Sequence, residues 1–472
     1  MKSTYKQLEL ELSQTKAELS QTNTLLKQAL EMIDILKKEI EDLKDKLNKN
    51  SKNSSKPPST DQKGNTKDKG KKSKTKREGA HRPLFPKDRV DKTIKCCHEQ
   101  CPCCGSESLA VTGVLDVLHQ IELPEVRAIV TEYILQKTRC NSCDHTSFPN
   151  LPNGVPYSAF GPKLMGLVST LTGAFHLAKR EAIQLIKDLY DIDISVGSIP
   201  NIEERVSKAL DPTYQEIHDF VLESHFTKHF DETTWRDQGK RHYVWIASCD
   251  KAAFYMIDRY RNNLAFQKLI KNKNLQDKGT VSDRYAVYKG LGKHHQYCLA
   301  HLIRDFKGYG ERDGPDKKVG KALEKILAKA CSVHRKYKRG KITLAQRNRR
   351  LAFARKKAEF WLYEGLANGS GKLSGLCNRL LDEFDKLWTF AKHLHIDPTN
   401  NMGERDLRKM VIWRKKSYGT RSSRGKRFVE RITTIIQTLR KKKKNALKYI
   451  QQSLISFYQG EKAPQICPEM GF

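Results

Sequence analysis

The chain contains no run of about 18 apolar residues, the length that a membrane-spanning helix requires. Its first residues, MKSTYKQLEL, also lack the apolar segment of a secretory signal peptide. Acidic residues are scarce, since 54 Asp and Glu stand against 88 Lys and Arg, for a formal net charge of +34. We therefore expect a soluble protein that stays inside the cell and attracts nucleic acid. A membrane surface would attract the same charge, but no segment is suited to insert into it.

Disulfide bonds are not expected of the twelve cysteines, because thiols stay reduced inside the cell. Two Cys-x-x-Cys pairs, in CPCCG and RCNSC, have the spacing with which two thiolates grip one ion from a tight turn. They predict a structural zinc site made of Cys101, Cys104, Cys140 and Cys143. The alternative ligands are Cys103, Cys96, Cys97 and His98. Two or three strands are expected between the pairs, in 111–124 and 127–138. The other thiols, which we interpret as buried or incidental, are Cys249, Cys331, Cys377 and Cys467.

Residues 1–50 carry an apolar residue every seven positions, which is typical of a coiled-coil seam. The seam residues are Leu12, Leu19, Leu26, Ile33, Ile40 and Leu47. A lone amphipathic helix is the weaker interpretation, because the seven-residue period is strict. We therefore expect self-association through this segment, at least as a homodimer.

Residues 51–95 are rich in Lys, Ser, Asn, Gly and Pro and offer almost nothing to bury, which predicts a disordered basic linker. The linker can keep the protein soluble, and it can also contact DNA phosphates without reading sequence. A zinc-binding domain is expected to follow in 96–150.

Apolar spacing in 151–222 predicts helices, with Ser195 and Ser198 as N-cap candidates. Two helices joined by a short turn, the second starting near Ser198, fit a helix-turn-helix that sets its second helix in a DNA major groove. Plain helical packing gives the same pattern.

Residues 223–304 switch to short β-type runs with one helix, which indicates an α/β domain. Basic helices then fill 305–398, a helix begins near Thr399, and another basic helix follows from Arg424. These predict a second part of the same domain in 399–445, followed by a C-terminal tail in 446–472.

Three carboxylates stand at the ends of predicted elements: Asp231 ends the first β run, Asp283 ends the fourth, and Glu404 begins a helix. In an RNase H-like sheet the two strands are neighbours, and the helix brings the third carboxylate to them. Such a set suits two Mg²⁺ or Mn²⁺ ions, which catalyse in-line phosphoryl displacement. Each acid alone is more often a solvated strand end or cap, and Glu232 or Asp258 would fit the spacing as well.

Basic residues near the third carboxylate strengthen the hypothesis, because they can hold phosphate groups. The expected DNA contacts are Arg405, Arg408, Arg414, Lys415 and Lys416.

The motifs DETTW, SDRYAVY, CLAHLIRDF and TNNMGERDLR…WRKKS resemble the insertion-sequence sixty-six family of DDE transposases from bacterial mobile elements. That family also has a zipper-like start, a linker like NSSKPPS, a cysteine finger and a helix-turn-helix, and the resemblance covers about residues 1–445 in the same order. It implies an RNase H-like catalytic fold with a long helical insertion. It also implies the catalytic triad Asp231, Asp283 and Glu404, and the four finger ligands given above.

The resemblance further implies double-stranded DNA partners, namely terminal repeats and target DNA, and small accessory proteins encoded nearby. Cys298 and His301 are similar to a Cys-x-x-His signature of several transposases. As a metal pair they would be incomplete, so we expect them to pack or brace the active site. Two departures occur: the residue after Asp283 is Arg284 rather than Gly, and the paired arginines of the family are Ile303 and Arg304 here.

The expected function is Mg²⁺-dependent cleavage at the ends of an insertion element and transfer of the 3′-hydroxyl ends to target DNA. The first alternative is a DNA-binding regulator derived from a transposase, without turnover. The second is another RNase H-like nuclease, such as a resolvase, that cuts branched DNA without joining it.

Overall fold

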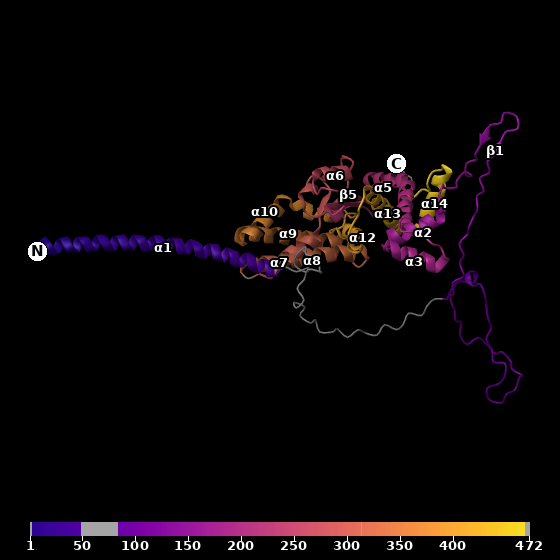
Figure 1. The fold of residues 1–472 in the computed structure, drawn as a ribbon. Coiled ribbons are helices and arrows are strands. Elements are labelled where there is room, and N and C mark those ends of the chain that lie inside the picture. Colours follow the sequence, from indigo (N-terminus) through magenta and orange to yellow (C-terminus); the bar gives the residue numbers. More distant parts are fainter. Residues whose placement is uncertain (1, 49–83, 313, 468–472) are drawn as a thin grey trace.

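The computed structural model describes residues 2–48, 84–312 and 314–467. Most of the predicted linker, and the last five residues of the predicted tail, lie outside these ranges. Helix α1 (Lys2–Asn48) is one continuous helix that extends away from the globular part (Figure 1). The seam positions from Leu12 to Leu47 are all exposed, between 46% and 68%. Among the described helices, none combines the length and apolar character that a membrane crossing needs.

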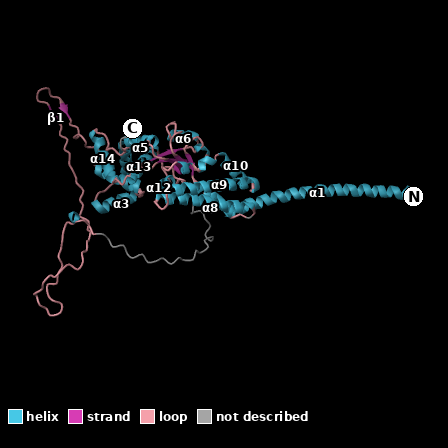
Figure 2. Cartoon of the chain, turned by 180° about the vertical axis from the view of Figure 1, so that it is seen from behind, coloured by secondary structure: helices cyan, strands magenta, loops and turns pink. Residues whose placement is uncertain are grey.

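The segment of residues 84–161, before the globular part, is largely extended, with little strand (Figure 2). It contains a 3-10 helix, η2 (Lys87–Arg89), and a hairpin of two-residue strands, β1 (Thr138–Arg139) and β2 (Thr146–Ser147). The strands predicted in 111–124 and in most of 127–138 do not form. Their apolar side chains are exposed, and no neighbouring strand supplies the hydrogen bonds that such strands need.

Four helices follow, and they share one hydrophobic core with the sheet. They are α2 (Pro162–Ala174), α3 (Lys179–Tyr190), α4 (Ser198–Ala209) and α5 (Asp211–Glu223). Helix α4 begins at Ser198, as predicted, but its N-cap residue is Gly197, and Ser195 instead accepts a hydrogen bond from the backbone N–H of Ser198 at 3.2 Å. One side of α4 is buried against α2 and α13, so only its other side is open to a partner.

The central sheet has five strands in the order β5-β4-β3-β6-β7. Strands β3, β4 and β5 are antiparallel, whereas β6 runs parallel to β3 and β7 parallel to β6. Their bounds are β3 (Lys228–Asp237), β4 (Lys240–Ser248), β5 (Ala253–Asp258), β6 (Thr280–Ser282) and β7 (His295–Tyr297). Helix α6 (Asn263–Leu269) and the 3-10 helix η3 (Ala286–Tyr288) lie in the connections.

Strand β3 is longer than the sequence predicted, because it continues into a hairpin with β4. The two turn residues, Gln238 and Gly239, both have positive φ, at 50° and 76°, which suits the right-handed twist of a two-residue hairpin. Asp231 therefore lies inside β3 instead of at its end.

Helix α13 (Ser423–Lys441) covers the free edge of β5. Backbone N–H groups of Ala253, Tyr255 and Ile257 donate to side chains of α13. The acceptors, in the same order, are Thr438 at 3.2 Å, Thr434 at 3.1 Å and Glu430 at 2.6 Å. The spacing of the acceptors along α13 matches that of the donors along β5, because four residues of a helix rise about 6 Å and two residues of a strand span about 6.8 Å.

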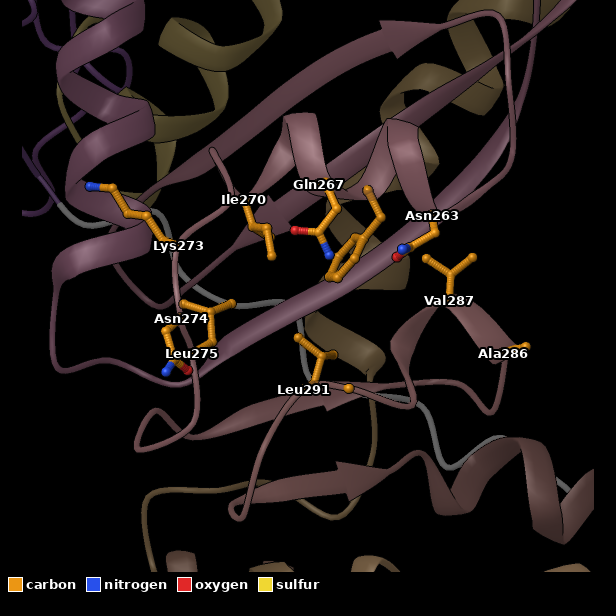
Figure 3. A pocket seen from close by; sticks show the side chains of 11 residues that line it. Asn263, Gln267, Ile270, Lys273, Asn274, Leu275, Ala286, Val287 and Leu291 are labelled. Atoms are coloured by element: carbon orange, nitrogen blue, oxygen red, sulfur yellow. The ribbon is translucent and has the colours of Figure 1, made fainter.

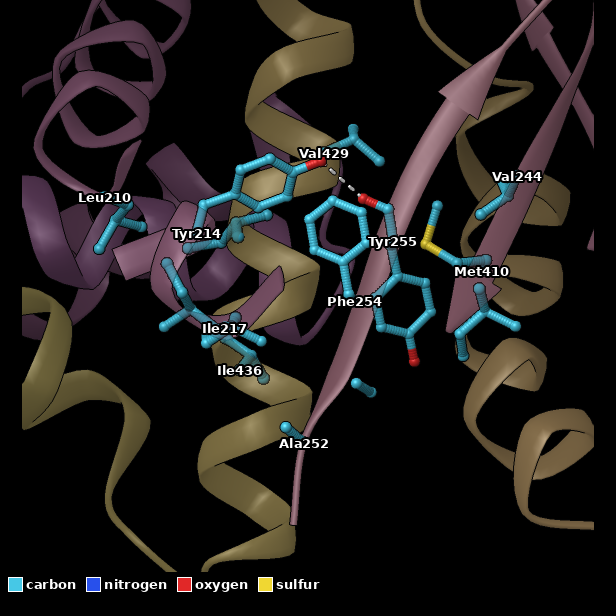
Figure 4. Packing of buried hydrophobic residues seen from close by; sticks show 14 of the residues in the cluster. Leu210, Tyr214, Ile217, Val244, Ala252, Phe254, Tyr255, Met410, Val429 and Ile436 are labelled. Atoms are coloured by element: carbon cyan, nitrogen blue, oxygen red, sulfur yellow. Dashed lines mark hydrogen bonds between the residues drawn. The ribbon is translucent and has the colours of Figure 1, made fainter. Parts of the chain in front are cut away.

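The core between these elements is drawn in Figure 4. Phe254 and Tyr255 of β5 pack between Tyr214 of α5 and Met410 of the helix that follows the insertion, and Tyr214 donates a hydrogen bond to the Tyr255 carbonyl at 2.9 Å. Helix α14 (Ala446–Gln459) packs on α2 and α13. The region predicted as a tail is therefore in large part a core helix.

The insertion is helical, as its sequence pattern predicted, and its helices form a second hydrophobic core. Its elements are α7 (Leu299–Gly310), α8 (Pro315–Lys338), α9 (Leu344–Asn368), α10 (Gly371–Asp382), the 3-10 helix η4 (Phe384–Leu387) and α11 (Thr389–Lys392). After it, α12 (Asn401–Ser417) returns to the sheet and packs across β3 and β4.

Candidate active site

Asp231 and Asp283 stand at the same level of two neighbouring parallel strands. The register pairs His229 of β3 with Val281 of β6, and each aspartate follows two residues later. Since side chains two residues apart lie on one face of a strand, both carboxylates are directed to the same side of the sheet. Strand β6 ends at Ser282, so Asp231 lies where β3 loses its parallel neighbour.

The carboxylates at this point act on one another electrostatically. Burial raises the pKa of Asp231 well above its usual range, and the negative charges of Glu232, Asp283 and Glu404 raise it further. The N–H of Glu232 donates to Asp231 Oδ1 at 2.9 Å and opposes this shift. The fold therefore places Asp283 and Glu404 within electrostatic range of Asp231, and bound cations would relieve the repulsion between these charges.

Glu404 reaches the site from the first turn of α12, and Asn400 fixes where that turn begins. Asn400 is completely buried, and its Nδ2 donates to the Phe230 carbonyl at 2.8 Å. Its Oδ1 lies 3.0 Å from Nδ1 of His229, and its backbone N–H donates to Cys298 Sγ at 3.1 Å. One side chain thus ties the start of α12 to the part of β3 that directly precedes Asp231.

This role of Asn400 and of His229 was not predicted from the sequence. The only local signal is an Asn in front of a helix in TNNMGER, which reads as an ordinary cap. Asn400 makes no side-chain cap bond here, because its amide is used for contacts about 170 residues away.

Cys298 and His301 lie beside Glu404. The ligand atoms of Cys298, His301 and Glu404 are all within 4.8 Å of one another, and His301 Nε2 is 3.7 Å from Glu404 Oε1. Burial raises the pKa of the Cys298 thiol to about 11, so it remains a neutral thiol at pH 7. The pair therefore adjoins the predicted catalytic carboxylates, where a bracing role was expected.

The two other acids that the spacing allowed behave differently. Asp258 lies on β5 and forms an ion pair with Lys268 at 2.9 Å, away from the site. Glu232 directly follows Asp231, but its carboxylate forms an ion pair with Arg261 at 2.5 Å. The buried Tyr288 hydroxyl donates a hydrogen bond to the same carboxylate. Burial and the charge of Asp283 raise the pKa of Glu232. Because both oxygens of Glu232 are used by these partners, we interpret it as a positioning residue beside Asp231.

The predicted phosphate contacts on α12 fall into two groups. Arg405, Arg408, Lys415 and Lys416 are exposed and open to solvent. Arg414 is half-buried, and its guanidinium donates to Thr233 and Thr234 of β3. Its contacts hold α12 against the sheet.

A divalent cation fits the residues at this site. Carboxylates are the donors that Mg²⁺ and Mn²⁺ prefer, and buried polar atoms are rarely left unpaired in proteins. Here Glu404 Oε1 and His301 Nδ1 are both buried without a hydrogen-bond partner.

The two Cys-x-x-Cys segments form similar turns. Gly105 N–H donates to the Cys101 carbonyl and Asp144 N–H to the Cys140 carbonyl, both at 2.9 Å. Backbone N–H groups lower the pKa of Cys101, chiefly that of Cys104, and of Cys140, chiefly that of Ser142. The side chains of Cys104 and Cys143 are also hydrogen-bonded to these two thiols, whereas Cys103 contributes only its backbone.

The two turns are not gathered around one point. Across the described ranges, the potential metal ligands whose donor atoms all lie within 4.8 Å of one another are Cys298, His301 and Glu404. Neither the finger cysteines nor Asp231 and Asp283 belong to this group.

A cavity of about 530 Å³ lies between α6 and the segment from η3 to Leu291 (Figure 3). Its lining includes Phe266, Gln267, Ile270 and Leu291, and none of the three predicted catalytic carboxylates. It is separate from the candidate active site.

A family model described as Transposase IS66 family matches residues 157–427, and one described as the zinc-finger binding domain of transposase IS66 matches residues 98–144. Residues 7–84 match a family of unknown function. No curated protein matches the chain. The first match covers more than half of the chain and includes all three carboxylates, which confirms the resemblance seen in the sequence: this protein belongs to the IS66 family of transposases.

Proposed function

We propose that this transposase cleaves DNA at the ends of an insertion element and joins the freed 3′-hydroxyl ends to target DNA. The proposal is supported by the register, which puts Asp231 and Asp283 two residues after paired positions of β3 and β6, and by the charges of Asp283 and Glu404, which both raise the pKa of Asp231. The sheet, three antiparallel strands followed by two parallel ones, supports assignment to the RNase H-like fold.

The three carboxylates would hold two divalent ions, which supply activation of the attacking oxygen and stabilisation of the leaving oxygen. The protein's own contribution is position. Asn400 and Arg414 fix α12 on the sheet. Arg261 and Tyr288 hold Glu232 in place next to Asp231. The exposed cations of α12 would hold the DNA backbone beside the carboxylates.

DNA recognition would involve the finger and the helices of 151–222. We propose that zinc joins Cys101, Cys104, Cys140 and Cys143, and that closure of the finger covers the apolar side chains exposed between the two turns. The second helix of the helix-turn-helix, α4, could offer DNA only its open side, since the other is packed in the core.

Two copies of the protein would pair through α1 and bring the two element ends together. The exposed seam of α1 supports this, because an apolar stripe of that length is stable in water only when it is covered.

The test is a cleavage assay on DNA that carries the element ends, with Mg²⁺, comparing the natural protein with Asp231→Asn. Asp250→Asn, an exposed aspartate in the turn after β4, is the matched control. Cleavage should disappear with Asp231→Asn and persist with Asp250→Asn. Equal product from Asp231→Asn would refute the enzymatic proposal and favour a DNA-binding regulator.

A second assay supplies an element end that is already cut and asks for joining to target DNA. Joined product supports transposition. Cleavage without any joining, on branched substrates, would instead identify a nuclease of the resolvase kind.

A further inference from the structure

Glu404, in the first turn of α12, has a buried carboxylate oxygen, Oε1, with no hydrogen-bond partner. Nε2 of His301, on α7, lies 3.7 Å from this oxygen. An unpaired buried acceptor costs free energy, and the separation is too long for a hydrogen bond between them. The arrangement therefore points to something held between or beside the two side chains.

The separation suits two ligands of one ion. Donor atoms that each lie about 2.1 Å from one octahedral ion are about 3.0 Å apart when adjacent and about 4.2 Å apart when opposite. The 3.7 Å between His301 Nε2 and Glu404 Oε1 lies between these values, so a shift of about 0.5–0.7 Å brings the two atoms to one ion.

The position of His301 is fixed by the same frame that fixes the catalytic acids. Cys298, which caps α7, donates its N–H to the Ser282 carbonyl at 2.8 Å, directly before Asp283. Leu299 N–H donates to the Pro398 carbonyl at 2.9 Å, and Arg284 pairs with Asp305 of α7 at 2.8 Å. Helix α7 is thus held on one side by the segment that carries Asp283 and on the other by the segment that leads to Glu404.

Cys298 has a different part in this arrangement. Its sulfur accepts the Asn400 N–H and is buried, so it anchors the junction of β7, α7 and α12. Of the Cys-x-x-His pair, only the His301 imidazole therefore remains to bind a metal ion.

We propose that His301 Nε2 and Glu404 Oε1 bind the same divalent ion, so that one of the two metal positions has a nitrogen donor beside its carboxylates. This rests on the proposed function, since it concerns an ion of the same site. Imidazole binds first-row transition ions better than it binds Mg²⁺. The site should therefore bind Mn²⁺ more tightly than an all-carboxylate site would, relative to Mg²⁺.

The experiment measures Mn²⁺ and Mg²⁺ binding to the full-length, zinc-loaded protein by calorimetry, without DNA. His301→Leu removes the donor, and His301→Gln places an amide oxygen near the position of Nε2. His301→Leu should weaken Mn²⁺ binding by at least about 10–100-fold, which is the loss that removal of even a partner behind a metal ligand causes. His301→Gln should retain Mg²⁺ binding and lose most of the preference for Mn²⁺. His225→Gln, an exposed histidine before β3, is the control for nonspecific binding.

Thermal unfolding without metal shows whether each variant is folded, and His301→Gln keeps the test decisive if His301→Leu is not. Unchanged Mn²⁺ affinity and unchanged preference in a folded His301 variant would overturn the inference. Asp231→Asn in the same series separates the two proposals. If it abolishes cleavage while the His301 variants bind Mn²⁺ normally, only the role of His301 is wrong; if it leaves cleavage intact, the proposed function itself is wrong.

Discussion

Replacing Asn400 by Ala should damage both the stability of the fold and the position of Glu404. The substitution removes the amide that donates to the Phe230 carbonyl and the oxygen that faces His229 Nδ1. Both partners are buried and would remain without a replacement. A buried group that loses its partner costs about 1–3 kcal/mol, so the two together should lower the free energy of unfolding by about 2–6 kcal/mol.

The effect on activity follows from geometry. Asn400 directly precedes α12, and Glu404 lies one turn later, so loosening the start of the helix displaces the carboxylate. A displacement of about 1 Å at a reacting centre can cost about 100-fold in rate. Cleavage should fall to that extent, whereas DNA affinity should hardly change, because the exposed cations of α12 remain.

The measurement is urea unfolding followed by tryptophan fluorescence, since Trp235, Trp245 and Trp413 lie in the same core. Asn401→Ala is the matched control, because Asn401 is the next residue and is exposed. The reasoning is refuted if both variants unfold at the same urea concentration and cleave equally well.

Three further outcomes are expected. Burial raises the pKa of Glu430 to about 7 in the folded protein, so its stabilising contribution is complete below its unfolded pKa of 4.5 and is lost as pH rises through 7. The free energy of unfolding of Glu430→Gln, relative to that of the natural protein, should therefore rise by up to about 3 kcal/mol between pH 5 and pH 8. Unfolding measured at both pH values checks this, and an unchanged difference would contradict it. Cys104→Ser should lose bound zinc by metal analysis while Cys103→Ser retains it, and the reverse result would move the ligand to Cys103. Ile33→Asp should abolish self-association in analytical ultracentrifugation, whereas Ile35→Asp, outside the seam and also exposed, should not. Dissociation by both would argue against a specific seam.

The sequence predicted the elements that depend on local pattern. The α1 helix, the five β runs, the helical insertion and the helix that bears Glu404 all occur, because apolar periodicity and caps act over a few residues. The pairing of Asp231 with Asp283 was also predictable, since it follows from placing two strands side by side.

Long-range contacts account for what the sequence did not predict. The use of Asn400 for β3, of Arg414 for Thr233 and Thr234, and of α14 for the main core depend on partners more than a hundred residues away. The finger shows the converse case. Its apolar segments read as strands, but a strand exists only when another pairs with it, and here each segment is alone.

The covered edge of β5 has a consequence for how copies of this protein can meet. An open outer strand would accept a strand from a second molecule and lengthen the sheet, which is a common route to both binding and aggregation. Threonine and glutamate side chains of α13 already occupy the outward N–H groups of that strand. Two copies of the protein must therefore meet without merging their sheets at this edge, and fibre growth from β5 is disfavoured.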